Sequence, residues 1–158
     1  MIIFPAAPGG HAIFCDDLRE EVGGKNSLIG VYGSDLMINA TPPVMLPQLS
    51  CVATINLDPE RMPGQLTIQI KKYLPSGVEE VLTAVELPPF ADIPQPEYRP
   101  GYGDSKRLFT LSAAMKMVPL AIEGEFTLRA VALIDDDEYR LGGLTVRLQP
   151  NGPPSELK

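Results

Sequence analysis

The fold is decided by the stretch Gln65-Leu66-Thr67-Ile68-Gln69-Ile70-Lys71. Apolar and polar residues alternate along it, and successive side chains of a β-strand point to opposite faces of the sheet. The stretch therefore predicts a half-buried strand of an antiparallel sheet, whose buried face carries Leu66, Ile68 and Ile70.

The same alternation recurs along the chain between turn residues. Strands are expected at 11–18, 27–32, 50–57, 65–73, 78–87, 107–118, 126–134 and 139–148, with a short piece at 36–39. Strands joined by turn signals about every 8–12 residues are typical of a sandwich. We therefore expect an all-β, single-domain antiparallel β-sandwich, Ig-like or C2-like, of about eight strands over residues 1–150. A flexible, proline-rich tail should follow at 151–158.

In-phase alternation also predicts a shared core. Its expected members come from four strands: Ile55, Leu66, Ile68, Ile70, Phe126, Leu128 and Val146. The strand at 126–134 differs from the others because Val131 and Leu133 make its second face apolar as well. Such a strand is either covered on both sides or part of an interface, so we expect the chain to form a homodimer.

The composition is that of a globular protein. The 158 residues are 44% hydrophobic and 21% charged, which fits one domain with its own core. With 20 acidic and 13 basic residues the net charge is −7, which argues against nucleic acids and anionic membrane surfaces as partners. No apolar run approaches the roughly 20 residues that span a bilayer, and the N-terminal stretch is broken early by Pro5. We expect a cytoplasmic protein.

A family resemblance enters at the N-terminal strands. The stretch at 15–25, CDDLREEVGGK, followed by SLIGVYG at 27–33, resembles the N-terminal signature of a family of small uncharacterised bacterial proteins, a domain of unknown function. The resemblance covers roughly residues 11–57 and is looser near the C-terminus, where Glu123-Gly124-Glu125 lacks the proline of the family's turn. It implies a cytoplasmic β-sandwich and brings no activity, ligand or catalytic residue.

Two acidic clusters could hold a cation. One joins Asp16 and Asp17 to the glutamates that follow them, and the other is the turn at 135–138. Calcium takes six to eight oxygens from a shaped loop, and neither cluster has that spacing, so each is also explained as a charged hairpin. Asp16 and Asp17 should point to opposite faces, and the inward carboxylate would need Arg19 or a backbone amide as its partner. A calcium- or small-ligand-binding sandwich and an enzyme with a carboxylate-based site stay open as alternatives.

The sequence holds few residues suited to zinc binding, phosphate binding or thiol chemistry. His11 and Cys15 lie about 13 Å apart along one strand, too far to bind one zinc ion, and the chain has no second histidine. The glycines do not form a phosphate-binding loop. Cys15 and Cys51 are expected to be reduced core thiols, although a disulfide is allowed in principle. We therefore expect no cofactor, no metal and no catalytic residue.

The segment at 88–106 is the one long irregular stretch. Besides five prolines it carries aromatic and basic residues of the kinds that favour protein contacts: Phe90, Tyr98, Arg99, Tyr102 and Lys106. Loops beyond about 12–15 residues are uncommon in compact domains and often bind partners. The alternative is a crossover between the sheets, packed by its own aromatic rings. The sequence thus favours a non-enzymatic protein-binding or assembly module, without indicating the partner.

Overall fold

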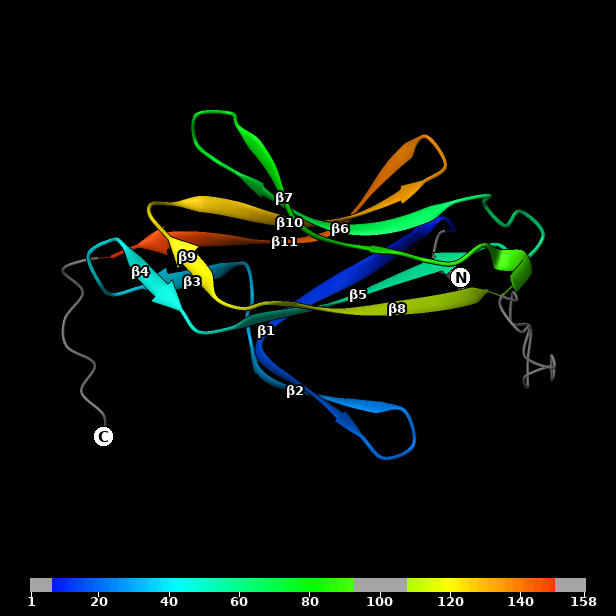
Figure 1. Ribbon diagram of the computed structural model, residues 1–158, viewed down its shortest axis with the longest axis horizontal. Helices are drawn as coiled ribbons and strands as arrows, with labels where there is room; N and C mark the ends of the chain where they lie inside the picture. Colours follow the sequence, from blue (N-terminus) through cyan, green and yellow to red (C-terminus); the bar gives the residue numbers. More distant parts are fainter. Residues whose placement is uncertain (1–6, 93–107, 150–158) are drawn as a thin grey trace, which may run out of the picture.

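The structure, a computed structural model, describes residues 7–92 and 108–149. These residues form two packed sheets and a small two-stranded ribbon (Figure 1). The prediction of an all-β, single-domain sandwich is confirmed. The tail predicted at 151–158 lies outside the described residues, as does the part of the 88–106 loop that follows residue 92.

The two sheets of the sandwich differ in size and in strand order. The four-stranded sheet has the order β2-β1-β5-β8 and is antiparallel throughout. Its strands are β1 (Gly9–Glu21), β2 (Lys25–Val31), β5 (Leu49–Leu57) and β8 (Phe109–Met117). The five-stranded sheet has the order β3-β11-β10-β6-β7. Its strands are β3 (Asp35–Ile38), β11 (Asp137–Leu148), β10 (Phe126–Ile134), β6 (Leu66–Tyr73) and β7 (Glu79–Glu86).

The eight long strands are those that the alternation predicts. Three short strands complete the fold. β3 corresponds to the short piece expected at 36–39, whereas β4 (Val44–Leu46) and β9 (Leu120–Ile122), which form a separate ribbon, were not predicted. The sheets depart from a purely antiparallel arrangement at one place, because β3 runs parallel to β11. The only helical element among the described residues is one turn of 3-10 helix, η1 (Phe90–Asp92), and no helix there is long and apolar enough to cross a membrane.

The core lies between the two sheets and contains every residue expected there. Ile55, Leu66, Ile68, Ile70, Phe126, Leu128 and Val146 all belong to one cluster of buried side chains. Fully burying one such side chain contributes about 1.5–3 kcal/mol, so the packed inner faces of β5, β6, β10 and β11 hold the sandwich together.

The second apolar face of β10 is covered within the chain at Val131, whereas Leu133 stays half-exposed. Val131 is buried although it lies outside the main core cluster, and its cross-strand neighbours are Gln69 on β6 and Arg140 on β11. Neighbouring residues of the chain itself therefore bury Val131. The homodimer stays a prediction, and on this face of β10 only Leu133 remains partly exposed for it.

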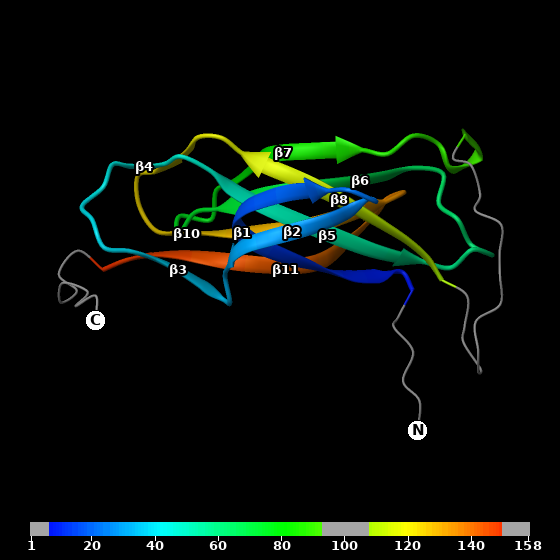
Figure 2. The same ribbon diagram turned by 90° about the horizontal axis from the view of Figure 1, so that it is seen from below.

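One hairpin leaves the body of the sandwich. Residues Gly9–Cys15 of β1 pair with β5, whereas the rest of β1 pairs only with β2. The cause is local, because β5 begins at Leu49 and Pro47 stands just before it, so β1 outruns its partner. Figure 1 shows this hairpin, in blue, projecting from the four-stranded sheet, and Figure 2, seen from below, shows β1 and β2 in front of the other strands. We call residues 16–31 the arm.

Candidate functional site

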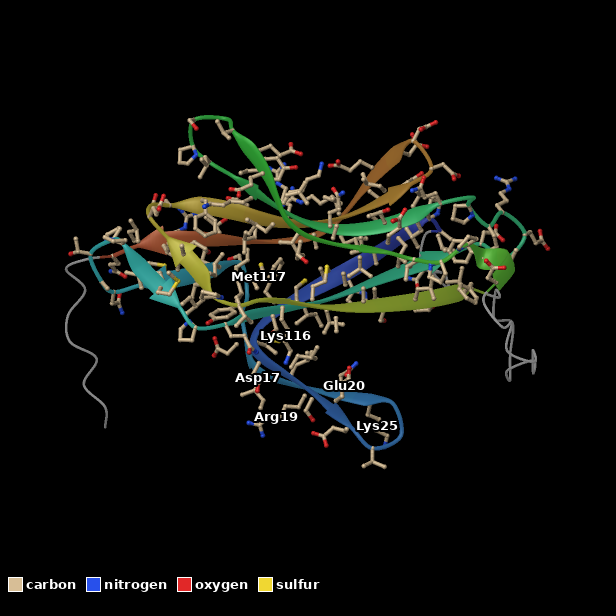
Figure 3. All side chains as sticks on the ribbon, in the orientation of Figure 1. Asp17, Arg19, Glu20, Lys25, Lys116 and Met117 are labelled. Carbon is tan, nitrogen blue, oxygen red and sulfur yellow. The ribbon has the colours of Figure 1, made fainter. Side chains whose placement is uncertain are left out.

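The base of the arm is held by the carboxylate of Asp17. This group accepts hydrogen bonds from the Leu18 backbone N–H at 2.8 Å, from Gln48 Nε2 at 2.8 Å and from Arg19 Nε at 3.3 Å. Lys116 Nζ on β8 lies 3.8 Å away. Figure 3 shows Asp17 and Lys116 together at the base, with Arg19 farther out on the arm. The bonds from Gln48 and Arg19 lower the pKa of Asp17, so its negative charge persists at neutral pH.

Gln48 joins the arm to the sheet and is a residue that the sequence does not single out. Its Nε2 contacts Asp17, and it also lies 3.1 Å from Ser50 Oγ and 3.3 Å from the backbone oxygen of Asp16. A lone glutamine beside a proline carries no motif or periodicity. Its role follows only from the register that places the start of β5 beside the point where the arm departs.

A second contact fixes the return strand. The hydroxyl of Tyr32 donates a hydrogen bond to Asp16. Gly30 makes room for this carboxylate, because a Cβ at Gly30 would lie 2.0 Å from Asp16 Oδ2, and its φ of +66° also favours glycine. Burial, followed by the bond to Asp16, raises the pKa of Tyr32 to about 12. The Tyr32 hydroxyl therefore stays protonated as a donor at neutral pH.

The sequence-based expectation for the acidic pair is confirmed in part. Asp17 does use Arg19 and a backbone amide as partners. The expectation that one carboxylate points inward is wrong, because Asp16 is exposed and Asp17 is half-buried. The arm has already left the sandwich at these residues, so the inward face of the strand there no longer faces the core.

Residues of nucleophilic type are buried at the arm base. Cys15 and Ser50 sit opposite each other in the β1–β5 register, and both are 0% exposed. Burial, together with the negative charges of Asp16 and Asp17, raises the pKa of the Cys15 thiol. Cys51 is also free and buried, in the core. A thiol that is both protonated and inaccessible is a poor nucleophile.

The outer part of the arm is exposed. β2 is an end strand of its sheet, so within the described residues nothing pairs with its second edge. Ile29 is 41% exposed and Val31 is 58% exposed, and both lie on this strand. Asp17 is the cross-strand partner of Ile29, so charge and apolar surface adjoin there. An edge strand with exposed apolar side chains is suited to pairing with another polypeptide.

The second acidic cluster serves the fold. Asp135 Oδ1 accepts hydrogen bonds from the backbone N–H groups of Gly64 and Gln65, at 2.9 and 3.0 Å. Glu138 Oε2 lies 2.6 Å from Lys71 Nζ. Across residues 7–92 and 108–149, no three histidine, cysteine, aspartate or glutamate residues gather closely enough to hold a metal ion. The turn between β10 and β11 thus binds to β6 and to the two residues that precede β6.

The residues expected to bind a partner fall into two groups. Phe90 is buried in the core, and its ring packs edge-on against Phe109 on β8 with 6.0 Å between the ring centroids. Tyr98, Arg99, Tyr102 and Lys106 lie outside the described residues. Their contact role stays a prediction.

Comparison with known proteins adds no relative. No protein-family model, curated protein or solved structure matches the chain. The basis for a functional proposal is therefore the geometry of the arm and the surfaces around it.

Proposed function

We propose that this chain is a non-enzymatic protein-binding or assembly module that uses the arm as its contact surface. The observation that carries the proposal is the edge of β2, which is unpaired among the described residues and bears exposed Ile29 and Val31. An extended segment of a partner can add to such an edge through backbone hydrogen bonds, while its side chains contact the apolar pair.

The arm is preorganised for this role at its base. Bonds to Asp17 from Gln48 on the sheet and Arg19 on the arm, and the bond between Asp16 and Tyr32, fix where the hairpin leaves the sandwich. A surface that is ordered before binding loses less conformational entropy when a partner docks. The buried, protonated Cys15 and the buried Ser50 favour binding over catalysis at this site.

The partner is proposed to be another protein in the cytoplasm. The chain's net charge of −7 disfavours nucleic acids and anionic membranes as partners. A second copy of the chain is the alternative occupant of the same edge. Light scattering separates the two, because self-association through β2 would double the 17.1 kDa mass without any added protein.

The proposal is tested by substitutions on the arm. Ile29→Lys should abolish co-purification of a partner, or dimerisation, and leave the melting temperature unchanged, because the side chain lies on an exposed edge. Val78→Lys is the matched control, since Val78 is 55% exposed just before β7 and far from the arm in the chain. Retention of every partner and of the same mass by Ile29→Lys would refute the assignment.

The loop at 88–106 is tested in the same experiment. Tyr98→Ala with Tyr102→Ala should leave folding nearly intact and remove a partner if the loop also forms contacts. Unfolding of that double variant would instead show that the two rings are structural.

A further inference from the structure

A second feature lies on the outer face of the five-stranded sheet, on β10. The guanidinium carbon of Arg129 lies 4.4 Å from the ring centroid of Tyr73 on β6. Its Nε is buried and donates to no acceptor in the described part of the chain, and no hydrogen bond or ion pair forms there for the rest of the side chain. A buried donor without an acceptor destabilises the folded state, so the Nε–H of Arg129 is a group that an added acceptor would satisfy.

The nearby acidic groups have other partners. Lys71, the neighbour of Arg129 in the β6–β10 register, is bound by Glu79 at 2.8 Å and by Glu138 at 2.6 Å. Arg129 interacts with Glu79 only through its charge. After the hydrogen bond from Lys71, this charge is a further and smaller cause of the lowered pKa of Glu79. Glu79 and Glu138 are thus engaged by Lys71, and neither forms an ion pair with Arg129.

A hollow of about 230 Å³ opens beside Arg129. The hydroxyls of Thr127 and Thr145 line it and lie 3.3 Å apart. Tyr73 lines it as well, and Glu125 contributes an acid. That acid accepts a hydrogen bond from the Leu148 backbone N–H at 3.0 Å, so one of its oxygens is already occupied.

The adjacent position is a glycine, which keeps the surroundings of Arg129 open. A Cβ at Gly143, the β11 partner of Arg129, would lie 3.3 Å from Arg140 Nη2 and 3.8 Å from Arg129 Cγ. The Arg140 guanidinium therefore reaches toward the stem of Arg129 across this gap. Neither Arg129 nor Arg140 forms a salt bridge among the described residues.

We propose that this hollow binds a carboxylate group. The planar fork of an arginine matches the two oxygens of a carboxylate, and the threonine hydroxyls can donate to the same group. The volume fits a small organic acid or one acidic side chain and is below that of drug-sized sites. Either a free acid or the glutamate of a protein partner could supply the carboxylate. The site is separate from the arm, so it does not depend on the function proposed above.

The test follows the Arg129 Nε–H resonance in ¹H–¹⁵N spectra of the whole protein. Propionate and free glutamate, added at constant ionic strength, should shift this resonance and the amides of Thr127 and Thr145 along a saturating curve. Sodium chloride in place of the acid should not. The absence of saturation, or an equal shift with chloride, would overturn the proposal.

Variants and a second ligand complete the test. Arg129→Gln should raise the dissociation constant for propionate at least tenfold, whereas Arg61→Gln, in the exposed loop before β6, should leave it unchanged. Thr127→Val keeps the arginine and should weaken binding by a smaller factor, which supplies a readout if Arg129→Gln fails to fold. Binding of Arg129→Gln with wild-type affinity would contradict the assignment. A glutamate-containing peptide that binds more tightly than free glutamate would identify a protein as the source of the carboxylate, and equal affinities would identify a small acid.

Discussion

Replacing Lys71 should destabilise the protein measurably, because this side chain connects three strands. Its side chain is 11% exposed, and Nζ lies 2.8 Å from Glu79 Oε1 on β7 and 2.6 Å from Glu138 Oε2 on β11. Removing one partner of a buried ion pair costs about 3–5 kcal/mol, whereas an exposed pair contributes about 0–1 kcal/mol. Here the ammonium is buried and both carboxylates are nearly half exposed, so Lys71→Met should cost about 2 kcal/mol.

The assay is urea unfolding of Lys71→Met and of the triple variant that adds Glu79→Gln and Glu138→Gln. Methionine preserves the apolar stem, so the loss reports on charge. Without the ammonium the two carboxylates face each other unpaired, and neutralising both should recover most of the lost stability. The midpoint should move while the slope stays constant, because the exposed surface of the unfolded chain does not change.

The effect should depend on pH with a definite sign. The bond to Lys71 lowers the pKa of Glu79 below its ordinary value of 4.5, so the stability from this pair is present above that value. It is lost as the pH falls through the lower, folded pKa. The difference between wild type and Lys71→Met should therefore shrink near pH 3. A Lys71→Met protein as stable as wild type at pH 7 would refute the reasoning, since it would mean that desolvation of the ammonium cancels both ion pairs.

Three further substitutions test the core, the arm and the buried thiol. Leu128→Ala should cost about 2–5 kcal/mol in chemical denaturation, because Leu128 is fully buried in β10, and a loss below about 0.5 kcal/mol would contradict its placement. Gly30→Ala should cost about 1–3 kcal/mol, since the new Cβ would strike Asp16, whereas Gly33→Ala meets nothing within 4 Å and should be nearly neutral; equal effects would refute the packing at Gly30. Burial raises the pKa of Cys51 from 9.0 to about 12, so the folded protein keeps this proton at a pH where the unfolded chain has lost it. The stability of the wild type should therefore fall more steeply than that of Cys51→Ala as the pH rises from 9 toward 12. Parallel stability curves for the two proteins would show that Cys51 is not the group responsible.

The long strands could be predicted from the sequence because each carries its own alternation. The inward residues of β6 and β10, such as Ile68 and Leu128, lie where that pattern places them. The short strands β4 and β9 could not be predicted, since three residues hold no periodic signal and their pairing depends on closure of the sandwich. The parallel pairing of β3 with β11 is likewise a contact between distant segments.

The proposed binding surfaces could be predicted from the sequence only in part. The acidic stretch at Asp16 and Asp17 does mark the arm, but nothing in the pattern indicates that β1 outruns β5 there. Gln48 and Arg129 carry no motif, and their importance appears only when the register places each beside particular neighbours. The apolar second face of β10 predicts a partner protomer, whereas in the structure the chain itself buries Val131.

Crosslinking tests most directly whether the edge of β2 is where this chain meets another polypeptide. A photoreactive amino acid at Val31, 58% exposed on β2, is compared with the same group at Val118, 61% exposed after β8. Illumination in cells that make the protein should give a discrete crosslinked product from position 31, to a partner or to a second copy, and none from position 118. Equal yields from both positions, or no product from position 31, would contradict the account.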